Sequence, residues 1–495
     1  MPAPIFTPAP LGVGLLWSPA VASLLATAGT IRPAVIALSP QTLWRRGADG
    51  TPRGWMEPGL DAPETLTLPR LMRSAGLTLA TSTEWCPHAT EFWRRSVQRM
   101  QPAWVSEDLA FSRVAGGAPD AGSRYAGAAL PALQCVATVL AAVRRIESLR
   151  RLGVAPLAFR NVANHLLPQA GEMHDGDFLA AVADASGSGI VLDLHALWVN
   201  ERSGRARAAD VIARLPLHRV WEIHLASCDE TSGEPGRRIP AAMLECLTQW
   251  LPRMPRVGAL ILDPMPDAER GLDALALAAD LRTLRELWPL RGTMPPQPRT
   301  TPARAAAVPG SSALVSPACS AREWERSLAL LANGCEVPAL PRSLRQLSGD
   351  PGLAAHRRHL ESQRTARLAE CLPLSWRALV LHLGLPAAQS LRQAFWRAHW
   401  PQEQALAESR LFAQFLRRAL PAGGAGMPQL QTVVDFELAC AESAHSGVET
   451  QVLLQDEPML LLAALARRSG TVASANASIS SAPRRGIQPR LQVPA

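Results

Sequence analysis

The chain has 495 residues, and a single hydrophobic core stops growing at roughly 250–300 residues, so its length predicts two or three domains. Hydrophobic residues make up 47% of the chain and charged residues 19%, which excludes wholesale disorder. No run approaches ~18 uninterrupted apolar residues, and no basic region precedes the first apolar stretch. We therefore expect a cytoplasmic protein with no membrane span and no secretory signal.

The formal net charge is +8, and all 50 basic residues are arginine because the sequence contains no lysine. The arginines occur as scattered pairs such as Arg45-Arg46 and Arg144-Arg145, not as a block, which argues against a nucleic-acid-binding surface. The 8 cysteines form no CxxC pair, which argues against a structural zinc site and a disulfide framework. Most of them are interpreted as buried fillers.

Eight short apolar runs alternate with helical patterns between residues 11 and 286. The runs are Leu11–Leu16, Ala34–Leu38, Leu77–Ala80, Trp104–Val105, Pro156–Phe159, Ile190–Leu194, Val220–Leu225 and Val257–Leu262. Continuously apolar strands need cover on both faces, and eight of them separated by helices predict an α/β fold, a (β/α)8 TIM-like barrel over residues 1–286. Functional side chains are then expected at the carboxyl ends of the strands.

The rest of the chain has a different composition. Residues 287–318 are rich in Pro and Ala, as in an interdomain linker. Residues 319–466 repeat apolar side chains at helical spacing, for example Trp324, Leu328 and Leu331, and predict a mostly α-helical domain. Residues 467–495 are small and polar and are expected to be a disordered tail.

Polar residues collect where the barrel strands are expected to end. They are Glu107, Arg160, Asn161, Asp193, His195, Glu222, His224 and Asp263. Carboxylates and imidazoles that converge at a barrel mouth are typical of a metal site. Asp193 and His195 are two residues apart, so on a strand both would point the same way.

Several strings in the barrel half occur in the order and spacing of one known family. They are Ser106-Glu107-Asp108-Leu109-Ala110-Phe111, Arg160-Asn161-Val162, Gly171-Glu172-Met173, Leu192-Asp193-Leu194-His195 and Glu222-Ile223-His224-Leu225-Ala226. This half resembles the multinuclear non-heme iron-dependent oxidative enzymes, the MNIO family. The resemblance implies a TIM barrel that works with a partner protein on cysteines and other residues of ribosomally made (RiPP) precursor peptides.

The helical half looks like the partner proteins of such enzymes. The strings that carry this looser similarity are Leu391-Arg392-Gln393-Ala394-Phe395-Trp396 and Asp435-Phe436-Glu437-Leu438-Ala439. The resemblance implies that the chain is a natural fusion of barrel and partner.

The sequence departs from the family at several positions that hold metal there. Asp108 stands where the family has His, and Arg160 stands where it has a carboxylate. The third strand usually ends in His but here reads Ala80, the second His after His224 is missing, and the last ligand is shortened to Asp263.

These departures leave the cofactor open between one iron ion and none. A guanidinium at ~4–6 Å from a divalent ion costs several kcal/mol, so Arg160 argues against a cluster of irons. Asp193, His195, His224 and Asp263, with Glu107 assisting, could hold one iron. Alternatively Glu107 pairs with Arg160 and the mouth is free of metal. Cys228 is either a thiolate ligand or, as we favour, a buried thiol.

Three hypotheses follow. In the first, the barrel acts in the modification of a precursor peptide by binding the peptide or a pathway enzyme, with a degraded metal site. In the second, it is a mononuclear iron oxidase that modifies peptide cysteines. In the third, the helical half is a DNA-binding regulator, although the absence of a charge block counts against nucleic acid as a partner.

Overall fold

A computed structural model describes residues 6–46 except 28 and 30, 52–55, 67–116 except 86, 123–153, 155–230, 236–265, 271–295, 319–335, 340–420, 428–446, 450–453 and 490–493. The predicted linker from residue 296 onward and most of the predicted tail lie outside these residues.

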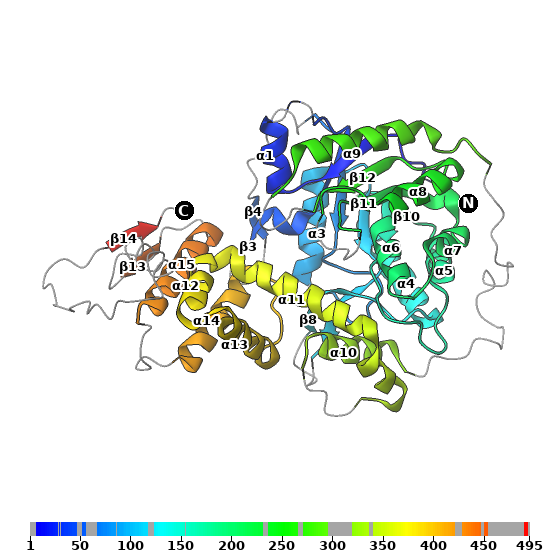
Figure 1. Cartoon of the computed structure of the whole chain (residues 1–495). Helices are drawn as coiled ribbons and strands as arrows, with labels where there is room; N and C mark the ends of the chain where they lie inside the picture. Colours follow the sequence, from blue (N-terminus) through cyan, green and yellow to red (C-terminus); the bar gives the residue numbers. More distant parts are fainter. Residues whose placement is uncertain are drawn as a thin grey trace, which may run out of the picture. The chain divides into compact units, whose positions relative to one another are not determined.

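Eight parallel strands close into a barrel, and each barrel strand pairs with the barrel strand that follows it in the sequence (Figure 1). They are β1 (Gly12–Leu16), β2 (Val35–Leu38), β5 (Arg70–Ser74), β6 (Val105–Asp108), β9 (Leu157–Arg160), β10 (Gly189–Asp193), β11 (Val220–Ala226) and β12 (Ala259–Asp263). The last strand, β12, pairs with the first, β1, and completes the ring. The predicted TIM-like fold is confirmed.

The third strand is not the predicted Leu77–Ala80 but β5, Arg70–Ser74. Only Leu71 and Met72 are apolar between the flanking arginines, so the run is too short to register as a buried strand. Leu77 and Leu79 are buried for another reason: this loop runs beside the chain at the end of β6, where Leu79 N donates to Asp108 O at 2.9 Å. The φ angle of Thr78, +45°, excludes a regular strand there.

The lower part of the barrel interior is a compact apolar core. Its buried members are Val35, Ala37, Leu71, Trp104, Ala158, Val191, Trp221, Ala259 and Ile261. A Cβ at Gly189 would lie 2.0 Å from the Trp221 ring, so this glycine makes room for the indole. Because side chains alternate along a strand, the next inward-facing residues belong to the barrel mouth.

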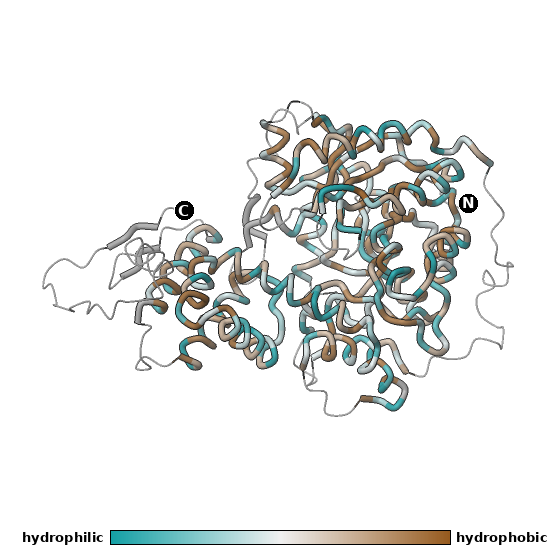
Figure 2. The backbone as a smooth tube through the Cα atoms, viewed as in Figure 1, coloured by the Kyte–Doolittle hydropathy of each residue, from teal (hydrophilic) through white to brown (hydrophobic). Residues whose placement is uncertain are grey.

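Helices surround the barrel on its outer side (Figure 1). They are α1 (Pro19–Thr27), α3 (Pro87–Met100), α4 (Val136–Arg151), α5 (Asp175–Ser186), α6 (Leu194–Arg202), α7 (Ala208–Ala213), α8 (Ala241–Trp250) and α9 (Ala274–Leu287). Hydrophobic and hydrophilic residues alternate along α9, as expected for a helix with one face on a core (Figure 2). None of the described helices is long and apolar enough to cross a membrane.

Two hairpins interrupt the alternation of strands and helices. β3 (Trp44–Arg46) pairs with β4 (Pro52–Trp55), and β7 (Phe111–Ala115) pairs with β8 (Ser123–Leu130). The second hairpin lies between β6 and α4, so that the connection after β6 is a β-hairpin followed by a helix.

The chain divides into two compact units. The first comprises Met1–Trp44, Thr51–Leu331 and Val337–His356, and thus holds the barrel, most of α10 (Ala321–Ala332), η7 (Arg342–Gly349) and the start of α11 (Pro351–Cys371). The second comprises Arg45–Gly50, Ala332–Glu336 and Arg357–Ala495.

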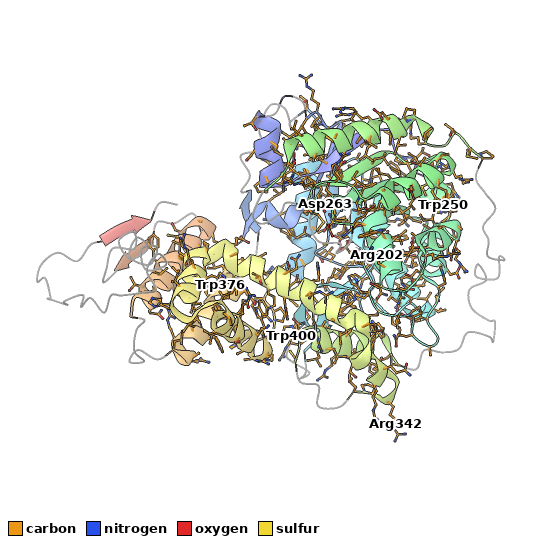
Figure 3. All side chains as sticks on the ribbon, in the orientation of Figure 1. Arg202, Trp250, Asp263, Arg342, Trp376 and Trp400 are labelled. Carbon is orange, nitrogen blue, oxygen red and sulfur yellow. The ribbon has the colours of Figure 1, made fainter. Side chains whose placement is uncertain are left out.

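The second unit is mostly helical, as predicted. It contains the rest of α11, then α12 (Pro373–Leu383), α13 (Leu385–Ala398), α14 (Ala405–Ala419) and α15 (Pro428–Ser446), and an antiparallel pair of strands, β13 (Thr450–Leu453) and β14 (Arg490–Val493). Its core contains Phe395, Phe412 and Leu416, and Trp376 packs against it (Figure 3). Arg364 is buried in this unit and donates to Glu408 at 2.7 Å.

Candidate functional site

The barrel mouth is lined by charged side chains that alternation turns inward. Asp108 pairs in register with Arg160 across β6 and β9, and Asp193 with His224 across β10 and β11. Arg73 on β5 and Asp263 at the end of β12 complete the layer; Figure 3 labels Asp263. Sequence analysis identified all of these except Arg73, which was missed because the third strand was misplaced.

Arg160 is the centre of this layer. Its Nη2 lies 2.5 Å and its Nε 2.7 Å from Asp108 Oδ1, while its Nη1 lies 3.1 Å from Asp193 Oδ2. Burial lowers the pKa of Arg160, but Asp108 and Asp193 outweigh burial and raise the pKa above its ordinary value. The guanidinium is therefore a permanent cation between two carboxylates.

Asp193 uses both carboxylate oxygens within the protein. Oδ2 accepts from Arg160, and Oδ1 accepts from Ala196 N at 2.9 Å, which caps the start of α6. Asn161 holds its backbone, donating to Asp193 O at 3.0 Å and accepting from Asp193 N at 2.8 Å. Burial raises the pKa of Asp193, but Arg160, assisted by His224, outweighs burial and keeps the pKa below its ordinary value.

A second ion pair lies at the more open side of the mouth. Arg73 Nη1 is 3.3 Å from Asp263 Oδ2, and the two side chains are 20% and 33% exposed. Asp263 is thus reachable from solvent but is already paired with a cation.

His224 is buried and is bonded to a neighbour on its own strand. Its Nε2 lies 2.5 Å from Glu222 Oε1, and Trp104 Nε1 donates to Glu222 Oε2 at 2.7 Å. Glu222 therefore joins the imidazole to the apolar core below.

Glu107 does not pair with Arg160, contrary to the metal-free arrangement considered above. It follows the inward-facing Ser106 on β6, so alternation turns it to the opposite face of the strand, and its register partner is Ser74. Its carboxylate is fully buried, and the polar groups beside it are the Ser74 side chain and the backbone of Leu77 and Thr78. Burial raises the pKa of Glu107 to about 8, against the lowering effect of Ser74, so it is uncharged at neutral pH.

His195 and Cys228 lie apart from the inward layer. β10 ends at Asp193, so His195 belongs to α6 and does not share a strand face with Asp193 as expected; its ring stacks on Trp198 at 6.2 Å between centroids. Cys228 is buried, and burial raises the pKa of its thiol to about 12. A thiol of this kind stays protonated at neutral pH, as expected for the buried thiol that we favoured.

The residues present do not fit an iron centre. Arg160 pairs with Asp108 and Asp193, and Arg73 pairs with Asp263. A metal cation among these carboxylates would be repelled by both guanidinium groups. Within the described part of the chain, no group of three or more His, Cys, Asp or Glu side chains is arranged to hold a metal ion. The three carboxylates of the layer are instead paired with its two guanidinium groups.

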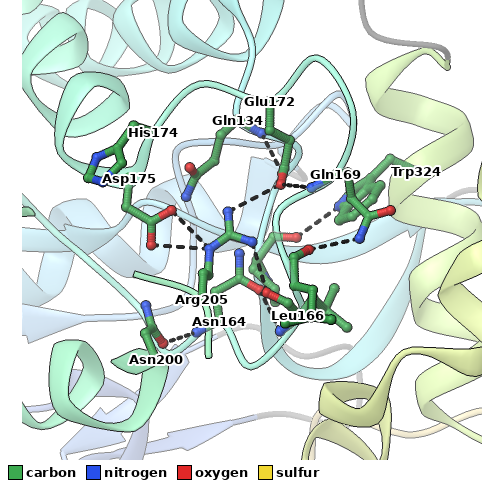
Figure 4. A network of polar contacts seen from close by, with 12 residues as sticks. Gln134, Asn164, Leu166, Gln169, Glu172, His174, Asp175, Asn200, Arg205 and Trp324 are labelled. Atoms are coloured by element: carbon green, nitrogen blue, oxygen red, sulfur yellow. Dashed lines mark hydrogen bonds and ion pairs between the residues drawn. The ribbon is translucent and has the colours of Figure 1, made fainter. Parts of the chain in front are cut away.

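The loop between β9 and α5 is held by a buried network that sequence analysis missed (Figure 4). Arg205 Nε donates to Asp175 Oδ1 at 2.9 Å, its Nη1 donates to Leu166 O at 2.9 Å, and its Nη2 lies 3.3 Å from Glu172. Glu172 belongs to the Gly171-Glu172-Met173 string, which pointed to this loop, but no local signal marked Arg205. The network gives the loop a single shape beside the mouth.

A small cavity of about 30 Å³ lies between this loop, α5 and α6. Asn161, Asn164, Asn200 and Gln134 contribute amide groups to its lining. Asn164 Nδ2 and Gln134 Oε1 are buried with no partner among the described residues. The cavity is large enough for ordered water, which would satisfy both groups.

Residues 60–262 match the family model of the RiPP precursor modification enzyme MbnB/TglH/ChrH. A UPF0276 protein of Anaeromyxobacter sp. is 29% identical over 198 residues, which cover 37% of this chain and 67% of that protein. A UPF0276 protein of Chromobacterium violaceum is 29% identical over 140 residues, covering 28% of this chain and 48% of that protein. The chain thus spans between about half and two thirds of the length of these curated relatives.

Solved structures with a similar backbone are more distant. D-psicose 3-epimerase from Clostridium cellulolyticum is 9% identical with a TM-score of 0.37, covering 57% of this chain and 99% of that chain. Endonuclease IV from Thermus thermophilus is 14% identical with a TM-score of 0.34, covering 56% and 97%. The fold assignment above rests on the strand order of the barrel itself.

The matched region runs from β5 into β12 and contains every string on which the resemblance depended. The family prediction from the sequence is confirmed. The barrel of this chain belongs to the MbnB/TglH/ChrH family of RiPP precursor modification enzymes, the MNIO family.

Proposed function

We propose that this protein acts in the modification of a ribosomally made precursor peptide, as a component that binds the peptide or the modifying enzyme. Family membership supports the pathway. The main support for the binding role is the pairing of the Arg160 guanidinium with Asp108 and Asp193, at positions where the family resemblance implies metal ligands.

The ion pairs support a stable mouth that needs no cofactor. Arg160 and its partners are nearly inaccessible, whereas Arg73 and Asp263 are partly exposed and present both signs of charge to solvent. A partner that offers charged or polar groups can be oriented there without chemistry taking place.

The test compares metal content with binding. Protein purified anaerobically is analysed by elemental mass spectrometry beside Asp193→Ala and His224→Ala, and a fluorescently labelled candidate precursor peptide is titrated into all three. We expect no iron that depends on these residues. The binding constant should change less than threefold in either variant, because neither carboxylate nor imidazole contacts the partner directly in a metal-free mouth.

The alternative is an active mononuclear iron oxidase that uses Asp193, His195 and His224. Iron near one equivalent that disappears in both variants, together with a mass change in the peptide under Fe(II) and O2, would establish this alternative and overturn the binding role.

Several arginines of the helical unit are paired within the unit, which weakens the case for a DNA-binding surface. Arg364 is bonded to Glu408, and Arg392 stacks on Trp376 at 4.5 Å. Titration of duplex DNA at two salt concentrations is the direct check, because binding through phosphates falls steeply with added salt.

A further inference from the structure

Residues 320–335 and 340–356 contact three loops at the carboxyl ends of the barrel strands. Ser82 lies in the loop after β5, Pro131 in the connection that follows β6, and His165 to Leu167 in the loop after β9. All of these contacts lie within the first compact unit. The segment is therefore packed on the barrel although it follows the linker.

The first attachment is made by the start of α10. Trp324 is 1% exposed, and its Nε1 donates to Pro131 O at 2.9 Å (Figure 4). The adjacent Glu325 is 2% exposed and accepts from Ser82 N through Oε1 and from Ser82 Oγ through Oε2, both at 2.6 Å. An indole and a carboxylate, both buried and both bonded to loop groups, have the character of an interface core.

The second attachment is made by the turn before α11. Asp350 Oδ2 accepts from Leu167 N at 3.1 Å, and its Oδ1 accepts from Gly352 N at 2.8 Å. A Cβ at Gly352 would lie 2.0 Å from His165 O, so the helix approaches the loop as closely as backbone allows. The rings of His165 and His356 meet edge to face at 5.0 Å.

We propose that the loops after β5, β6 and β9 form an interaction surface for a helical segment bearing an adjacent Trp and Glu, and that this protein's own residues 320–356 occupy it noncovalently. Trp324, Glu325 and Asp350 all bond directly to groups of the barrel loops. The covalent connection therefore only raises the effective concentration of the segment, and the interface holds once the connection is cut. This inference is independent of the proposed function.

The test uses the full-length protein with a specific protease site inserted between Ala307 and Val308. After complete cleavage, size-exclusion chromatography with light scattering measures the mass of the product. We expect the two fragments to elute together as a 1:1 complex of the mass of the intact monomer. Separate elution would overturn the proposal, and a 2:2 complex would show that a second copy supplies the segment, which would also overturn it.

Two variants test whether Trp324 and Glu325 hold the segment on the barrel loops. In the cleaved protein, Trp324→Ala and Glu325→Ala should each speed dissociation at least tenfold, whereas Arg326→Ala, exposed on the same helix, should not. In the uncleaved chain, hydrogen exchange of residues 79–84 and 131–135 should increase in the first two variants and stay unchanged in the third. Equal rates and equal protection in all three variants would refute the anchoring role even if a variant is less stable.

Discussion

Replacing Arg160 by Met tests the ion-pair account of the mouth. Methionine fills a similar volume without charge, and leaves Asp108 and Asp193 without their cation in a site where their side chains are 3% and 13% exposed. Removing one partner of a buried ion pair costs roughly 3–5 kcal/mol. We expect a loss of this size in the free energy of unfolding of the barrel at pH 7.

The pH dependence gives the prediction its sign. In the wild type the pKa of Asp193 is lowered by folding. The ionised carboxylate therefore stabilises the fold fully at pH values above its ordinary pKa, and this stabilisation disappears as the pH falls through the lowered pKa. In Arg160→Met the buried Asp193 loses the cation that lowers its pKa, so burial favours its protonated form and that variant is weakest at neutral pH. The difference between the two proteins should therefore shrink as the pH falls from about 7 toward 4.

The assay is urea unfolding at several pH values, with the barrel followed by hydrogen exchange of peptides from β6, β9 and β10. Arg73→Met is the matched control, because its pair with Asp263 is partly exposed and is worth about 1 kcal/mol or less. A cost of Arg160→Met below about 1 kcal/mol, or one that does not change with pH, would refute the reasoning.

Three further predictions concern buried titratable groups. Burial raises the pKa of Glu107 to about 8 and disfavours its charged form, so Glu107→Gln should stabilise the barrel progressively as the pH rises from 4.5 to about 8, by up to roughly 5 kcal/mol. Urea unfolding midpoints of the variant and the wild type at pH 5 and pH 9 measure this gain. An equal shift of the midpoint at both pH values would contradict the prediction. Burial likewise raises the pKa of Glu325 to about 7, so Glu325→Gln should protect α10 from hydrogen exchange more at pH 8.5 than at pH 5. Glu323→Gln, at an exposed position of the same helix, is the control. A protection by Glu325→Gln that does not change with pH would count against this prediction. Burial raises the pKa of the Cys228 thiol to about 12, so Cys228 should resist alkylation by iodoacetamide in the native protein at pH 7.5 and react in urea. Mass spectrometry measures the alkylation of this cysteine. Rapid alkylation in the native protein would disprove its burial.

Much of the architecture follows from local pattern. Strands buried on both faces are mostly apolar, and β11, where all seven residues are buried and only Glu222 and His224 are polar, is recognisable from its run alone. The family strings are also local, and they located Asp108, Arg160, Asp193 and His224 at one barrel mouth without any coordinates.

Tertiary contacts decided the rest. Arg160 is one residue of a strand end in the sequence, and only the register of β6, β9 and β10 sets its guanidinium between Asp108 and Asp193 while alternation turns Glu107 away. β5 contains two arginines and has no apolar run to mark it, because one of them, Arg73, points into a charged layer that exists only once the barrel closes. Trp324 and Glu325 read as an ordinary helix start, and their burial depends on loops about 190 and 240 residues earlier in the chain. Side-chain patterns report which face of an element is buried, whereas pairing between charges depends on which elements meet, and that is set by the closed fold.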